Sequence, residues 1–389
     1  MAESEDRVSD GGDARHGIVT RVAAFTRRFG LDVPLLMAPM AGACPPELAA
    51  AVARAGGMGA CGALLDPPEA IASWVARFRS LCGAGAAAHD DGGYGRRAPL
   101  QLNLWIPDPP PRRDAENEAR LRAFLERFGA AVPDDAIERA ASPGFAAQCE
   151  ALLEARPATV SSIMGLFAPE YVARLEAAGI AWFACATTLD EARRAEEAGA
   201  DAIVAQGAEA GGHRGAFDAT RARDDAVGTF SLLPQIVDAV DVPVIATGGV
   251  SDARGVAAAL VLGASAVQIG TGLLRSDESS VPRAWAEGLA AATPEGTRLT
   301  RAFSGRWGRA LATDYVRAAA AEDAPVPAPY PVQRALSAAM RRAATDAGDL
   351  GRMQAWSGQS AALAATGPAD ELVARLWRDA RTLLGLSAH

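Results

Sequence analysis

The sequence predicts an α/β fold, a (β/α)8 barrel, and three observations support this prediction. From about residue 33 onward, short apolar runs alternate with longer alanine-rich, charged segments, which is the pattern of βα units around a parallel sheet. Eight of the apolar runs have the length of a strand, more than an open doubly wound sheet commonly holds. The segments between them open on Pro, Ser or Asp and end in Gly, as helices do.

The strands are expected where short apolar runs stand between turn signals and helical segments. In chain order they are 33–40, 58–62, 99–105, 159–164, 180–186, 201–206, 242–248 and 265–270. Helices are expected between them, among them PPELAAAVARAG after the first strand, PEYVARLEAAG after the fourth, LDEARRAEEAG after the fifth and SDARGVAAALVLG after the seventh. The repeated order of strand and helix is what favours a closed barrel.

The predicted barrel domain covers residues 18–274. Two stretches interrupt the order of strand and helix, one inside this domain and one after it. Residues 106–157, which begin IPDPPPRRD, predict a helical insertion after the third strand. Residues 275–389 predict a helical C-terminal subdomain that packs on one end of the barrel, with the proline-rich stretch 324–331 as a stiff connector. The polar, acidic residues 1–17 predict a disordered N-terminal tail.

Composition and charge exclude several classes of function. The formal net charge is −9, all 38 basic residues are arginines, and none of them form a long cluster, so we expect no nucleic-acid partner and no membrane surface. The five cysteines are widely spaced without a CxxC pair, which predicts reduced thiols and no metal site. The N-terminus lacks a signal-peptide pattern, and no run of about 18 apolar residues occurs. We therefore expect a cytoplasmic protein.

Two glycine-containing turns are expected where the seventh and eighth strands end. The first is ATGGVSD, with Gly248 and Gly249, and the second is QIGTGLL, with Gly270 and Thr271. In (β/α)8 barrels, phosphate groups commonly bind at the loops after these two strands. Glycine lets the backbone approach an anion closely, and a helix that starts at the turn adds free amide groups. The pair of turns predicts a ligand that carries a phosphate group.

A histidine follows the predicted sixth strand, in the stretch AQGAEAGGHRGAF. His213 should lie at the same end of the barrel as the two turns, and Gly211 and Gly212 allow the backbone to pass close to a bulky ligand. An imidazole there can act as a base, an acid or a hydrogen-bond donor near neutral pH, although a single histidine can also have only a structural role. The other histidines are near a terminus or in a polar loop: His16, His89 and His389.

These motifs together resemble the nitronate monooxygenase family, formerly called 2-nitropropane dioxygenases. The resemblance covers about residues 31–385 and rests on APMAG, LNLW, DAIVAQGAEAGGHRG, VPVIATGGVSDARGVAAALVLGASAVQIGT and MQAWSGQS. It implies a TIM barrel with non-covalently bound FMN and no metal. It also implies an enzyme that oxidises alkyl nitronates with O2 to carbonyl compounds and nitrite.

The resemblance assigns roles to residues of this sequence at the matching motif positions. His213 would face the substrate beside the flavin ring. The residues that would contact the cofactor are Ala38, Pro39 and Met40 behind the ring, Asn103 and Gln206 at its polar edge, Gly211 and Gly212 in the loop that closes over it, Gly248, Gly249, Gln268, Ile269, Gly270 and Thr271 around the phosphate, and Gln359 near the flavin.

Several of these assignments have alternatives. Asn103 and Gln206 could satisfy backbone groups at the strand ends, and Met40 could be core packing. His213 could stabilise the nitro oxygens of a nitronate, protonated or as a hydrogen-bond donor, or abstract the α-proton of a neutral nitroalkane. Arg214 is expected to be structural, because arginine is no base at neutral pH.

Two other classes of function stay open at this point. An FMN-dependent NAD(P)H:quinone reductase or enoyl-acyl-carrier-protein reductase of the same fold shares the GGH loop and the phosphate turns, and the HRG continuation favours the monooxygenase. A non-catalytic flavin-binding interaction protein is the other class. The expected partners are a small-molecule substrate and O2, with a homodimer through the C-terminal tail also open.

Overall fold

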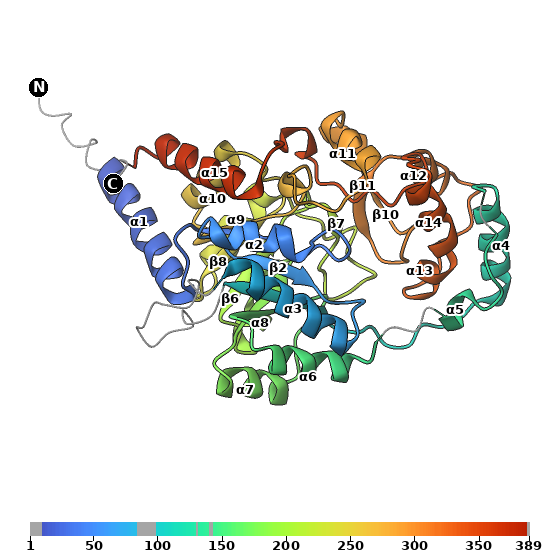
Figure 1. Ribbon diagram of the computed structural model, residues 1–389, viewed down its shortest axis with the longest axis horizontal. Helices are drawn as coiled ribbons and strands as arrows, with labels where there is room; N and C mark the ends of the chain where they lie inside the picture. Colours follow the sequence, from blue (N-terminus) through green and yellow to red (C-terminus); the bar gives the residue numbers. More distant parts are fainter. Residues whose placement is uncertain (1–9, 84–98, 130, 140–142, 387–389) are drawn as a thin grey trace, which may run out of the picture.

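Eight parallel strands form a barrel at the centre of the computed structural model, which describes residues 10–83, 99–129, 131–139 and 143–386 (Figure 1). The strands are β1 (Leu35–Met37), β2 (Gly59–Gly62), β3 (Leu100–Trp105), β4 (Thr159–Ile163), β5 (Ala181–Ala186), β6 (Ala202–Gln206), β8 (Val244–Thr247) and β9 (Ala266–Ile269). Their order in the sheet is β1-β9-β8-β6-β5-β4-β3-β2. A parallel bridge from Leu36 to Met58, next to β2, brings the two edges together.

All eight predicted strands are confirmed, each within its predicted range. The surrounding helices are α2 (Pro46–Arg54), α3 (Pro68–Cys82), α6 (Phe145–Ala155), α7 (Pro169–Ala177), α8 (Leu189–Glu197), α9 (Thr229–Val237), α10 (Ala253–Val261) and α15 (Ala369–Leu383). Several begin as the sequence indicates: the Thr188 and Asp252 side chains cap α8 and α10, and proline opens α2, α3 and α7.

The N-terminal helix α1 (Asp10–Phe29) packs against the interior of the barrel. Phe25 and Phe29 are buried in one cluster with Phe183 of β5, and the Phe29 and Phe183 rings meet edge to face with centroids 4.9 Å apart. Residues 10–17, predicted as part of a disordered tail, are therefore helical, and residues 1–9 lie outside the described residues. The chain passes from α1 into the start of β1 within a few residues, so α1 lies at the end of the barrel where the strands begin and covers it.

A small antiparallel sheet lies at the other end, and the sequence predicted none of its three strands. Its order is β10 (Thr297–Thr300), β11 (Gly308–Leu311) and β7 (Gly212–His213). Gly308 of β11 pairs with His213. The C-terminal segment was predicted to be helical, but it also contains strands, because the chain after residue 275 returns to the loop after β6 and pairs with it.

The remaining helices form a second body beside the barrel (Figure 1). They are α4 (Ala115–Glu126), α5 (Ala136–Arg139), α11 (Arg283–Ala290), α12 (Asp314–Ala318), α13 (Val332–Leu336) and α14 (Ala338–Asp346). The chain also has short 3-10 turns: η3 (Thr271–Leu273), which follows β9 and packs in the barrel core, η4 (Pro294–Gly296) and η5 (Ala361–Leu363). Phe124 of α4 and Leu336 of α13 share a second hydrophobic cluster, so the insertion packs on the C-terminal segment. By contrast, α6, also inside the predicted insertion, packs on the barrel helix α3.

The boundaries of the predicted domains stay a prediction. Among the helices of the described residues, none has both the length and the apolar character needed to cross a membrane.

Candidate active site

A cavity of about 880 Å³ lies at the ends of the barrel strands, a volume within the usual range for cofactor sites. Most of the predicted site residues line it: Ala38, Pro39, Met40, Asn103, Gln206, Gly211, Gly212, His213, Gly248, Gly249, Gln268, Gly270 and Thr271. We call this set, without His213, the barrel side of the cavity. Residues that are distant in sequence thus meet in one space, as the strand-end positions predicted.

Two predicted residues, Ile269 and Gln359, are not among the described residues that line the cavity. Ile269 is buried in the layer between sheet and helices, because successive strand residues point to opposite faces and Gln268 takes the inner one. The Gln359 side chain donates to the Pro294 carbonyl at 3.5 Å, while its neighbours Gly358 and Ser360 face the cavity.

The first glycine turn has a backbone that other residues would strain. Gly248 and Gly249 have φ angles of +107° and +74°, in the region that favours glycine. The C-terminal segment closes over both turns: Ser360 Oγ donates to the Gly249 carbonyl at 2.7 Å, and the Gly358 N–H donates to Thr271 Oγ1 at 3.0 Å. The turns are therefore held in place by residues about a hundred positions away in the chain.

Gly211 allows the closest approach between the His213 loop and the C-terminal segment. A Cβ atom at Gly211 would lie 2.5 Å from the Gly358 nitrogen and 2.8 Å from Thr271 Oγ1, both too close for real contacts. Glycine at this position is thus required by the packing of the protein itself.

Buried amide side chains surround the inner part of the cavity. Asn103 Nδ2 donates to Ser161 Oγ at 2.9 Å. Gln206 is engaged with the backbone, since its Nε2 donates to the His213 carbonyl at 3.1 Å and its Oε1 accepts the Gly215 N–H at 2.9 Å. Within the described part of the chain, Oε1 of Gln101 and of Gln268 has no hydrogen-bond partner, although both side chains are buried. Such oxygens fit a ligand with a polar edge.

His213 lies between two tryptophans, with its ring centroid 4.6 Å from that of Trp105 and 4.6 Å from that of Trp356. Its Nε2 is 2.8 Å from Ser304 Oγ, in the loop between β10 and β11. Burial, followed by the positive charges of nearby arginines, lowers the pKa of His213 to about 3. The imidazole is therefore neutral at pH 7, with one nitrogen able to donate and the other to accept.

The loop after His213 is fixed by a buried arginine. Arg214 is 2% exposed, and its guanidinium donates to the Gly207 carbonyl at 2.7 Å and to the Gln206 carbonyl at 3.2 Å. The side chain thus binds the backbone at the end of β6, which is the structural role expected for it.

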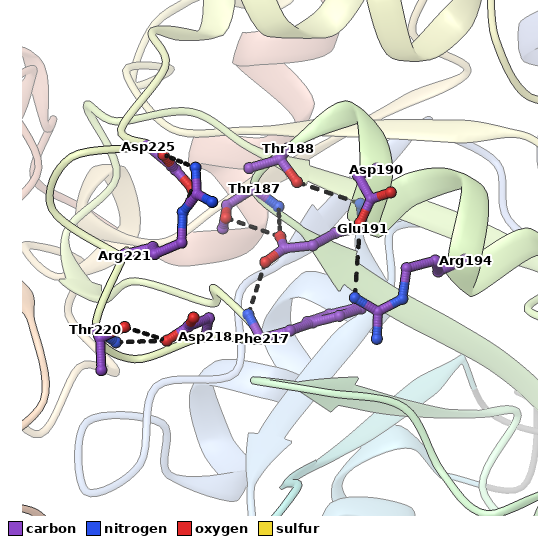
Figure 2. A network of polar contacts seen from close by, with 10 residues as sticks. All are labelled: Thr187, Thr188, Asp190, Glu191, Arg194, Phe217, Asp218, Thr220, Arg221 and Asp225. Carbon is purple, nitrogen blue, oxygen red and sulfur yellow. Dashed lines mark hydrogen bonds and ion pairs between the residues drawn. The ribbon is translucent and has the colours of Figure 1, made fainter.

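Figure 2 shows a second anchor for this loop, centred on the carboxylate of Glu191 at the start of α8. This buried carboxylate accepts the Thr187 N–H at 2.7 Å, the Thr187 hydroxyl at 2.8 Å and the Phe217 N–H at 2.7 Å. The Arg194 guanidinium lies 5.3 Å from the centroid of the Phe217 ring and pairs with Asp190. The segment four residues after His213 is therefore bound to a barrel helix.

Three arginines from the second body line the cavity. Arg334 comes from α13, and Arg341 and Arg342 come from α14, whereas Asp346 is the one carboxylate among the described lining residues. Arg341 is held by Gln354 Oε1 at 2.9 Å and by Ser337 Oγ at 3.1 Å. The wall formed by these helices is positively charged and attracts anions.

Sequence reasoning missed the residues that the C-terminal segment brings to His213. Ser304 is 91 positions away from His213, and Arg334 is farther still. Ser304 lies in AFSGRWG, a stretch with no motif that indicates a site. The arginines lie on short helices of ordinary composition, so only the folded arrangement reveals them. We call Ser304, Arg334 and Trp356 the C-terminal side of the cavity.

The fold and the cavity define a (β/α)8-barrel protein with a ligand site at the ends of its strands. A model of the nitronate monooxygenase family matches residues 24–379. A protein from Paraburkholderia phytofirmans called "Nitronate monooxygenase" is 38% identical over 358 residues, which are 90% of this chain and 93% of that protein. The chain belongs to the nitronate monooxygenase family and is an oxidoreductase.

Solved structures show the same fold. The structure of a nitroalkane oxidase from Streptomyces ansochromogenes matches with a TM-score of 0.81 and 35% identity, over 93% of this chain and 99% of that one. The structure of FabK from Thermotoga maritima matches with a TM-score of 0.68 and 26% identity, over 93% of this chain and 97% of that one. The (β/α)8 barrel predicted from the sequence is thereby confirmed.

Proposed function

We propose that the chain binds FMN in this cavity and uses O2 to oxidise alkyl nitronates to carbonyl compounds and nitrite. The observation that carries the proposal is the placement of a neutral His213 in the same cavity as two glycine turns and a positively charged wall. Membership of the family, and the similarity to a protein called a nitroalkane oxidase, support oxidation of nitro compounds.

The residues of the barrel side suit FMN. The turns at Gly248–Gly249 and Gly270–Thr271 offer backbone amides to its phosphate, and Ala38–Met40 offers a main-chain surface to its ring. The oxygens of Gln101 and Gln268 lack protein partners and suit the N–H group of the ring. When bound, FMN supplies the electron-accepting group of the reaction.

His213 and Arg334 would then act on the substrate. A nitronate is already an anion, so Arg334 attracts it and the ring N–H of His213 donates to a nitro oxygen. No proton transfer to His213 is needed for this substrate. A neutral nitroalkane would instead lose its α-proton to the unprotonated ring nitrogen, and the low pKa of His213 keeps that nitrogen free at neutral pH.

The experiment is an anaerobic titration of the purified, FMN-loaded protein with propionate 3-nitronate and, separately, with NADH and NADPH. Flavin absorbance is followed, oxygen is then admitted, and nitrite is measured. Flavin reduction by the nitronate with release of nitrite supports the proposal. Reduction by a nicotinamide alone indicates a reductase instead, and a protein that takes up no flavin contradicts both.

The proposal includes a reducing compartment, the cytoplasm. All five cysteines are free, and burial raises the pKa of Cys44 and Cys185 to about 12, which keeps both as unreactive thiols. A homodimer stays a prediction that sedimentation of the purified protein can test.

A further inference from the structure

A partly buried ion pair joins the start of the insertion to the loop that carries Ser304. Arg306, in the loop between β10 and β11, forms a bidentate pair with Asp108, which lies three residues after the end of β3. The Arg306 Nε to Asp108 Oδ2 distance is 2.7 Å, and the side chains are 4% and 29% exposed. Within the described ranges, Asp108 is the one carboxylate that pairs with Arg306. A charge this buried needs such a partner.

The segments that carry Arg306 and Asp108 both contact the His213 ring. The Arg306 N–H donates to Ser304 Oγ at 3.3 Å, and the same oxygen lies 2.8 Å from His213 Nε2. On the other side, Trp105 is three residues before Asp108 and packs edge-on against the His213 ring. Two of the segments that touch the imidazole, 105–108 and 304–306, are thus joined by one ion pair.

We propose that Asp108 and Arg306 are positioning residues for His213: their ion pair holds the Ser304 turn and the Trp105 segment together, and so fixes the orientation and the tautomer of the imidazole. This gives the start of the insertion a role at the site. The inference about the ring itself does not depend on the proposed function, and only its effect on turnover rests on that function.

The charges around His213 allow the effects of Arg306 and Asp108 on the protonation of the ring to be distinguished. Arg306 faces the ring from the β10–β11 loop, Arg334 from α13 and Arg341 from α14, and all three oppose its protonation. Asp108 pairs with Arg306 and so offsets part of its charge. Removal of the Arg306 charge therefore favours protonation of the ring, whereas removal of the Asp108 charge disfavours it, although either change breaks the same ion pair.

The test compares Asp108→Asn and Arg306→Gln with a matched control, Glu118→Gln, in the full-length chain with and without added FMN. Glu118 also belongs to the insertion and forms a bidentate pair with Arg113, at 2.5 and 2.6 Å. The readout is nitrogen NMR of the histidine rings between pH 3 and 8, with the His213 signal assigned from its loss in His213→Asn. These shifts report both the tautomer and the protonation of the ring.

We expect Asp108→Asn and Arg306→Gln to change the tautomer signal of His213, and Glu118→Gln to leave it unchanged. Arg306→Gln should raise the pH at which the ring begins to take up a proton by about one unit, and Asp108→Asn should not raise it. If Arg306→Gln does not fold, Arg306→Lys should change the tautomer without that rise. Wild-type ring shifts in both Asp108→Asn and the folded Arg306 variant would overturn the proposal, as would an equal change in Glu118→Gln.

On active enzyme, the same variants give a second readout. Asp108→Asn should lower kcat about tenfold or more with a smaller change in KM, because a misoriented ring affects the reacting geometry more than binding. An inactive wild-type protein would contradict the proposed function and leave the NMR test of the ion pair in force.

Discussion

The two sides of the cavity are built in different ways. On the barrel side, each residue lies within a few positions of a strand end, so the repeated βα unit alone brings it to the cavity. On the C-terminal side, Ser304 and Arg334 reach the site through contacts between segments about a hundred residues apart. Under the proposed function, this difference corresponds to a division of roles: the repeated unit would hold the cofactor, and the long-range side would adapt the site to one substrate.

His213 belongs to both sides. It follows β6 of the barrel after a short glycine loop, and as part of β7 it pairs with β11 of the C-terminal segment. Its backbone is therefore held by the barrel through Gln206, while its ring lies against Trp105 of β3 and against Ser304 and Trp356 of the C-terminal segment. Changes at His213 should affect chemistry without loss of the cofactor.

The largest effect is expected for His213→Asn. Loss of the imidazole should lower kcat by about 10²–10⁴-fold, the usual contribution of an acid–base or hydrogen-bonding histidine. FMN affinity should stay close to that of the wild type, because the barrel side is intact. Nitrite release and flavin fluorescence measure the two quantities.

His16→Asn is the control, because His16 is exposed on α1. A His213→Asn enzyme with wild-type kcat would show that the ring has no part in the reaction.

A second prediction concerns the anchor of the His213 loop. Glu191→Ala removes the acceptor of three hydrogen bonds from buried backbone and hydroxyl groups, so the free energy of unfolding should fall by about 3 kcal/mol. Asp190→Ala, one residue away, removes only an exposed ion pair with Arg194 and should cost less than about 1 kcal/mol. Urea unfolding measures both, and equal losses would mean that Glu191 does not anchor the loop.

The same division explains what the sequence could predict. The eight strands were found because each is a short apolar run with turn signals at its ends, and the strand-end residues followed from them. Strands β10 and β11 were missed because TRLT and GRAL each contain an arginine and are not apolar runs, and because they owe their pairing to one another and to β7. Likewise, Asp10–Gly17 has a polar sequence, and its helix is held by Phe25 and Phe29 later in the chain.

Whether a predicted site residue lines the cavity has a related explanation. Gln268 was placed by its strand, whereas Gln359 belongs to a segment without a repeated unit, and its side chain turns to Pro294. No local pattern could indicate Ser304, since its role depends on a loop that pairs with the barrel only in the folded chain.

A third prediction uses the low pKa of His213. The folded protein keeps this ring neutral down to about pH 3, whereas an unfolded histidine takes up a proton near pH 6.5. Proton uptake by the unfolded state therefore lowers stability as the pH falls from about 6.5 towards 3. At pH 5 the loss from this residue should be about 2 kcal/mol at most.

Urea unfolding of the wild type and His213→Asn at pH 8 and pH 5, both without FMN, isolates this contribution, because all other groups are shared. The wild type should lose more stability between the two pH values than the variant. An equal loss in both proteins would mean that His213 is protonated in the fold.

The smallest effect is expected for Arg334→Gln, which tests whether the C-terminal side selects the charge of the substrate. Loss of one positive charge from the cavity wall should weaken binding of an anionic nitronate by roughly 1–2 kcal/mol, seen as a rise in KM of about tenfold with little change in kcat. For a neutral nitroalkane the KM should not change, and Arg298→Gln, the same charge change at an exposed position of β10, should affect neither substrate. If KM rises equally for both substrates, Arg334 shapes the cavity and does not select by charge, and the division of roles between the two sides would then rest on His213 and its neighbours alone.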